Sequence, residues 1–88
     1  MLWGAGKNGK DLAKLILQKE KSFNWVTDND KKIGKDIYGI VLNDMNMLKS
    51  IENPQIIIAV ASPQDQKEIT LLMNKMSLKE GENYWFFA

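Results

Sequence analysis

The first ten residues, Met1-Leu2-Trp3-Gly4-Ala5-Gly6-Lys7-Asn8-Gly9-Lys10, decide the fold that we expect for this chain. A short apolar segment, residues 1–3, runs directly into glycines spaced as Gly4-x-Gly6-x-x-Gly9. A helical pattern follows over residues 9–20, with one face formed by Gly9, Leu12, Ala13, Leu15 and Ile16. A strand, a glycine-rich turn and a helix in this order predict the first unit of an α/β domain.

The remainder of the chain repeats this alternation. Four further segments are predicted as strands: residues 23–27, 37–41 (with Gly39 at a bulge or turn), 55–60 (an apolar run expected to be buried on both faces) and 84–87 (a last buried strand). Residues 44–50 predict one or two helical turns. Ser62-Pro63-Gln64-Asp65 predicts the start of a second helix, because it combines a capping hydroxyl, a proline and an acid.

Alternating strands and helices with right-handed connections predict a small doubly wound parallel sheet. We expect about five strands in the order 3-2-1-4-5, with helices on both faces. Residues 1–88 are too few for a second core and form a single module. Because the first strand is shorter than the usual ~5–6 residues, we expect the module to be excised from a longer chain that continues upstream of Met1.

The glycine loop predicts an anion-binding site. Gly4 permits a tight turn, Gly6 lets the backbone approach a pyrophosphate, and Gly9 lets the helix pack closely on the sheet. The loop residues Ala5, Lys7 and Asn8 complete the predicted site, and Lys7 is placed to reach an anion at the start of the helix. The free N–H groups and the positive end of the helix dipole favour a phosphate at this point.

Two further segments are expected beside this loop. Asp28 lies 19 residues after Gly9, at the end of the second predicted strand, where an acid can accept hydrogen bonds from ribose hydroxyls. Ala61 and Ser62 begin the second helix at the point where ligands bind open α/β sheets, and Ser62 is expected to act first as a helix cap. The alternative is that the glycines only connect a strand to a helix and Asp28 only shapes a turn.

A phosphate-loop NTPase is a second interpretation of the same residues. Gly4, Gly9 and Lys10 match the pattern G-x-x-x-x-G-K. Asp11, however, stands where a Ser or Thr would bind Mg²⁺, and a carboxylate there would repel the phosphates. The sequence therefore disfavours this interpretation.

The composition excludes several classes of function. The chain contains neither Cys nor His, so it lacks a thiolate nucleophile, the commonest general base and the usual zinc ligands. All 12 basic residues are Lys, and the net charge of +1 argues against nucleic acid as a partner. No apolar run reaches the ~20 residues of a membrane span, so we expect a cytoplasmic module without membrane insertion, metal or catalytic residues.

Three runs of residues resemble a known family. They are the glycine loop 4–10, the segment Thr27-Asp28-Asn29-Asp30-Lys31-Lys32-Ile33-Gly34-Lys35 with 38–42 after it, and residues 55–63. They resemble the Rossmann-like nucleotide-binding domains of bacterial surface-polysaccharide enzymes, namely sugar O-acetyltransferases, nucleotide-sugar dehydratases and modules attached to glycosyltransferases. Asn8, Lys31 and Val41 depart from the family pattern, in which His, Pro and Pro are common.

The resemblance implies a module that binds a nucleotide or nucleotide-sugar for a larger transferase, with the rest of that enzyme as its partner. Two alternatives remain open at this stage. The first is the NAD-binding half of an oxidoreductase, with an NAD-type cofactor. The second is a structural or interaction module without a ligand, for example one that forms a homo-oligomer through an exposed edge or its aromatic end.

Overall fold

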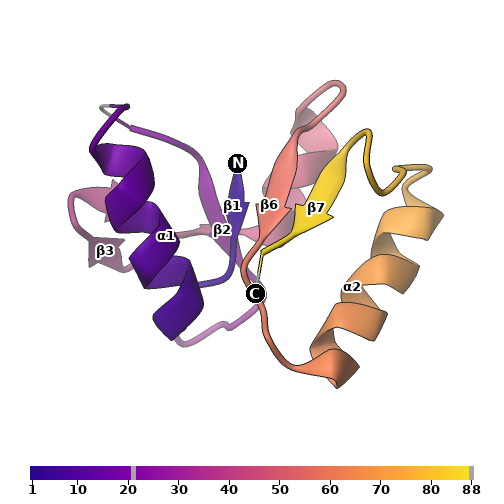
Figure 1. Ribbon diagram of the computed structural model, residues 1–88, viewed down its shortest axis with the longest axis horizontal. Helices are drawn as coiled ribbons and strands as arrows, with labels where there is room; N and C mark the ends of the chain where they lie inside the picture. The colour runs from indigo at the N-terminus through magenta and orange to yellow at the C-terminus, as the bar shows by residue number, and fades with distance from the viewer. Residues whose placement is uncertain (21, 88) are drawn as a thin grey trace.

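The computed structural model describes residues 1–20 and 22–87. In these residues, five short parallel strands form a sheet in the order β5-β2-β1-β6-β7. They are β1 (Leu2–Trp3), β2 (Trp25–Thr27), β5 (Asn43–Asp44), β6 (Ile56–Ile58) and β7 (Tyr84–Phe86). The helices α1 (Lys7–Leu17) and α2 (Pro63–Lys75) lie on opposite sides of this sheet (Figure 1). The mixed α/β architecture with a parallel sheet is as predicted.

The strand order differs from the prediction at one edge of the sheet. Residues 37–41 were expected to form the third strand, but this segment belongs to a separate antiparallel hairpin of β3 (Asp36–Ile37) and β4 (Ile40–Val41). Tyr38 and Gly39, with φ of 56° and 83°, form the turn between them, and two residues with positive φ favour a tight hairpin. The edge beside β2 is occupied instead by β5, in which Asp44 pairs with Thr27.

α2 starts where the sequence predicts, whereas α1 begins at Lys7 and ends at Leu17, earlier at both ends than the predicted 9–20. Ser62 caps α2 by accepting a hydrogen bond from the N–H of Asp65 at 3.4 Å, and Pro63 occupies the first turn. The predicted turns after residue 44 form the 3-10 helix η1 (Met45–Ser50). Within the described residues, neither α1 nor α2 has the length and the apolar character that a membrane-crossing helix needs.

The core is divided between the two faces of the sheet. Trp3, Val26, Ile56 and Ile58 pack with Leu48 of η1 and with Ile69 and Met73 of α2. On the other face, Leu2 and Trp25 pack with Ala13 of α1 and with Ile40 and Leu42 near the hairpin. Leu15, which the sequence placed on the buried face of α1, is 53% exposed. The buried face of this helix is therefore narrower than predicted.

One part of the sheet is uncovered. Ile57, Trp85 and Phe87 are 37%, 40% and 44% exposed. Ile57 pairs with Leu2 on one side and Trp85 on the other, which places it on the α1 side of the sheet, but α1 covers only β1 and β2. The predictions that β6 is buried on both faces and that β7 is a buried strand are therefore wrong. A period-two pattern shows which residues share a face and does not show whether another element covers it.

Candidate functional site

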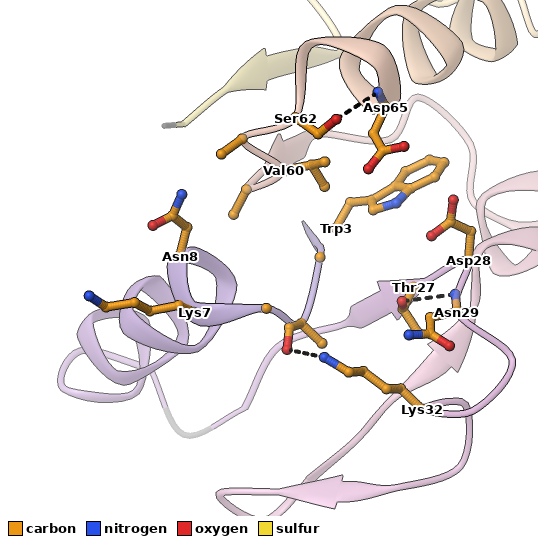
Figure 2. A pocket seen from close by; sticks show the side chains of 15 residues that line it. Trp3, Lys7, Asn8, Thr27, Asp28, Asn29, Lys32, Val60, Ser62 and Asp65 are labelled. Carbon is orange, nitrogen blue, oxygen red and sulfur yellow. Dashed lines mark hydrogen bonds between the residues drawn. The ribbon is translucent and has the colours of Figure 1, made fainter.

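A pocket of about 470 Å³ opens where β1, β2 and β6 end. Its walls are the loop between β1 and α1, the turn after β2 and the segment that leads into α2 (Figure 2). The chain leaves β1 toward β2 on one side, while β6 pairs with β1 on the other, so the connections diverge here. Crevices at such points are where open α/β sheets bind ligands.

The structure brings most of the predicted site residues together around this pocket. The lining includes eight of the nine: Gly4, Ala5, Gly6, Lys7, Asn8, Asp28, Ala61 and Ser62. The ninth, Gly9, is buried behind the loop at the start of α1. Three segments that are distant in the sequence therefore meet at one pocket.

The three glycines of the motif have different roles. A Cβ on Gly9 would overlap the carbonyl oxygen of Gly4, so the helix packs against the loop only when residue 9 has no side chain. Gly4 has φ of +116°, and a Cβ there would lie 2.8 Å from the carbonyl oxygen of Ala59. Gly6 has φ of −79°, and no heavy atom lies within 4 Å of its Cβ position. The fold therefore requires glycine at positions 4 and 9 and does not require it at position 6.

The amino end of α1 is uncapped. Gly6 is the N-cap residue and brings no side chain, and among the described residues no side-chain or backbone acceptor reaches the N–H groups of Lys7, Asn8 or Gly9. The first turn contains no acidic residue. These N–H groups are the positive end of the helix dipole, so this end of α1 favours an anion.

Two side chains hold the loop by hydrogen bonds to its carbonyl oxygens. The indole Nε1 of Trp25 donates to the carbonyl oxygen of Gly4 at 2.6 Å, and the Nζ of Lys32 donates to that of Ala5 at 2.9 Å. The N–H and C=O of a trans peptide point in opposite directions. The bond to Lys32 therefore turns the N–H of Gly6 away from Lys32, on the opposite side of the loop. Two hydrogen bonds from within the protein therefore hold the loop in this geometry.

The lysine side chain that contacts the loop is Lys32, which was not among the predicted site residues. In Figure 2 the side chain of Lys7 extends away from the other labelled residues, although its backbone lines the pocket. Lys32 is half-buried and reaches the loop itself. Its positive charge lies against the backbone that would face a phosphate, and Lys7 has no comparable contact among the described residues.

The turn after β2 and the start of α2, which form the other two walls of the pocket, each carry a carboxylate. Asp28 follows β2 and is exposed, next to Thr27, whose hydroxyl accepts a hydrogen bond from the N–H of Asn29 at 3.1 Å. Ser62 acts as the helix cap, as the sequence suggested, and Asp65 in the first turn of α2 is exposed toward the pocket. The site therefore has a positive end at the glycine loop and a negative side formed by these two acids.

Seven lining residues were not predicted: Trp3, Thr27, Asn29, Lys32, Ala59, Val60 and Asp65. Most of them adjoin predicted site residues, so extending each predicted wall by one or two positions would have found them. Lys32 is different, because its contact with Ala5 depends on how residues 29–35 fold back. Trp3 lies in the core cluster on the α2 side of the sheet.

Comparison of the chain with protein-family models, curated proteins and solved structures finds no significant match. The function is therefore inferred from the geometry of the pocket.

Proposed function

We propose that this module binds a nucleotide or nucleotide-sugar, with the phosphates seated on the glycine loop. The observation that supports this most is Gly6. The fold gives no steric or conformational reason for glycine at this position, whereas a phosphate approaching the uncapped N–H groups from outside gives one. A side chain at position 6 would project into open space where that phosphate would lie.

The neighbouring groups fit the same ligand. The amides of Lys7 and Asn8 donate to the phosphate oxygens, and Lys32 supplies positive charge behind the loop. Asp28 accepts from the ribose hydroxyls at the end of β2. The volume of about 470 Å³ lies within the usual ~300–1,000 Å³ range of small-molecule sites. The module positions its ligand and performs no chemistry by itself.

The biological setting that we propose rests on the family resemblance of the sequence. In that setting the module belongs to a transferase of bacterial surface-polysaccharide biosynthesis, either a glycosyltransferase or a sugar acetyltransferase, and works in the cytoplasm. The remainder of the parent enzyme carries the reacting groups. An NAD-binding half of an oxidoreductase is the competing enzyme class, and ligand preference separates the two.

Thermal melting against UDP, UDP-glucose, NAD, NADP, CoA and ATP tests the proposal. A ligand at 100 times its Kd adds about 2.7 kcal/mol, which raises the melting temperature of a domain of this size by roughly 10 °C or more. We expect the uridine nucleotides to give the largest shift. NAD as the best ligand would favour the oxidoreductase, and no shift with any of the six would remove the proposal.

The variant Gly6→Val locates the binding site. It should melt within a few degrees of the unmodified protein, because a side chain at position 6 meets nothing, and it should lose the ligand-induced shift. Gln64→Val is the matched control, since it adds the same side chain in the first turn of α2, outside the pocket lining. Binding that survives Gly6→Val would show that the phosphate lies elsewhere.

A second candidate function is self-association, favoured by the uncovered apolar face. Met1, Ile57, Trp85 and Phe87 line a shallow depression there, and β7 is the last strand of the sheet. Sedimentation of the purified module tests it. A dimer that Trp85→Lys dissociates, together with no response to nucleotides, would support an interaction module in place of a binding one.

A further inference from the structure

Trp3 has a buried hydrogen-bond donor without an acceptor. Its side chain is 1% exposed, and its Nε1 is the buried side-chain polar atom for which the described residues supply no partner. Trp25, equally buried, donates to Gly4. A buried donor without an acceptor is unfavourable, so a group that supplies an acceptor is bound more tightly there.

This donor lies at the functional pocket. Trp3 is the last residue of β1 and is part of the pocket lining. In Figure 2 the carboxylates of Asp28 and Asp65 lie on either side of the indole, whose nitrogen is on the ring edge that faces away from Asp65 in this view. Both carboxylates belong to exposed residues, and no side-chain hydrogen bond from another described residue reaches either of them.

We propose that Trp3 and Asp65 form a subsite for a neutral, hydroxylated group, the sugar of the ligand. This inference rests on the proposed function, because it takes the phosphates to lie on the glycine loop and the ribose to lie beside Asp28. The sugar then extends toward β6 and the start of α2. One of its hydroxyl oxygens accepts from Trp3 Nε1, and hydroxyl hydrogens are donated to the Asp65 carboxylate.

The chemistry of these two groups selects a hydroxyl. The indole N–H requires an acceptor and the carboxylate requires a donor, and a hydroxyl is both. An ammonium group would satisfy Asp65 and leave Trp3 unpaired. A carboxylate or a further phosphate would satisfy Trp3 and be repelled by Asp65 and Asp28. The subsite therefore distinguishes a neutral sugar from its uronic acid.

The contact requires a small local movement. The nitrogen of Trp3 has less than 1 Å² of exposed surface, so a rotation of the indole or of a side chain above it must accompany binding. This movement provides a direct signal, because the indole N–H resonances of Trp3, Trp25 and Trp85 can be followed separately by nuclear magnetic resonance. Trp25 is bonded to Gly4 and Trp85 lies outside the pocket, so both serve as internal controls.

The experiment titrates the ¹⁵N-labelled protein with UDP, UDP-glucose and UDP-glucuronic acid. We expect UDP-glucose to move the indole resonance of Trp3 and UDP to move it little. Trp3→Phe should weaken UDP-glucose about tenfold, the loss of one hydrogen bond of about 1.4 kcal/mol, and leave UDP within about twofold. Trp85→Phe is the matched control and should change neither affinity. Asp65→Asn should raise the affinity for UDP-glucuronic acid relative to UDP-glucose.

The outcomes separate this inference from the proposed function. If UDP and UDP-glucose both shift the amide of Gly6 while the Trp3 indole stays unmoved, the sugar subsite is wrong and nucleotide binding stands. The same conclusion follows if Trp3→Phe weakens both probes equally. If neither probe shifts Gly6 or Trp3, nucleotide binding fails and the sugar subsite fails with it.

Discussion

The amino ends of α1 and α2 lie at the same edge of the sheet and are built differently. α2 is closed by the protein itself, because Ser62 accepts from the N–H of Asp65, Pro63 removes one donor, and an acid stands in the first turn. α1 begins at Gly6, without a side-chain cap and without an acid in its first turn. The free N–H groups at the amino end are therefore capped by the protein in α2 and left uncapped in α1.

The difference between the two helix ends supports the proposed anion site at α1. Helix ends are commonly capped by side chains of their own sequence, as α2 is by Ser62. At α1 the loop is held by hydrogen bonds from Trp25 and Lys32, while the N–H groups of the first helical turn have no cap among the described residues. A rigid loop with unpaired N–H groups is suited to an external anion, and a loop that served only as a connection would have no need of both features.

Gly9→Ala is expected to have the largest effect on stability. In most helices this change stabilises by about 0.5–1 kcal/mol. Here the added methyl would overlap the Gly4 carbonyl, and we expect a loss of about 3 kcal/mol in urea denaturation. A variant as stable as the original would mean that α1 does not pack on the loop as described.

Trp25→Phe is next, because it removes the donor that holds Gly4. The buried carbonyl loses its partner and a small cavity forms, so the free energy of unfolding should fall by about 2 kcal/mol. Nucleotide affinity should fall as well, since the loop is no longer fixed. Trp85→Phe, at an exposed indole, is the control and should unfold at an unchanged urea concentration.

Ser62→Ala compares the two helix ends directly. Loss of the cap should cost about 1 kcal/mol in urea denaturation. The converse change, Gly6→Asp, supplies α1 with a cap and a carboxylate at its positive end. It should raise stability by a few tenths of a kcal/mol and abolish nucleotide binding. Unaltered binding by Gly6→Asp would contradict the assignment of the phosphate to this helix.

Lys32→Met is expected to have the smallest effect. It removes one partly screened charge and one hydrogen bond to Ala5, so nucleotide affinity should fall about threefold to tenfold at low salt and less at high salt. Lys31→Met, at the exposed neighbouring position, should leave the affinity unchanged. Equal effects of the two variants, measured by isothermal titration, would remove the special role of Lys32.

The sequence predicted the elements that have local signals. Ser62-Pro63 marked the start of α2, and the glycine spacing marked the loop, because capping and backbone conformation depend on neighbouring residues. The hairpin at Tyr38 and Gly39 was mistaken for a strand, since an apolar run does not show where the chain reverses.

Features that depend on distant parts of the chain were not predictable. Lys32 meets Ala5 across 27 positions, and the unpaired state of Trp3 Nε1 depends on what other elements bring near it. Exposure of Ile57 and Trp85 likewise depends on an element that does not cover them. These contacts and exposures become visible only in the three-dimensional structure.

The most direct test of the account follows the backbone amides of both helix ends during a titration with UDP. We predict saturable chemical-shift changes at Gly6, Lys7 and Asn8 that exceed those at Gln64 and Asp65, because only the end of α1 is left uncapped. Changes confined to α2, or none at either helix end with ligand in large excess, would contradict it.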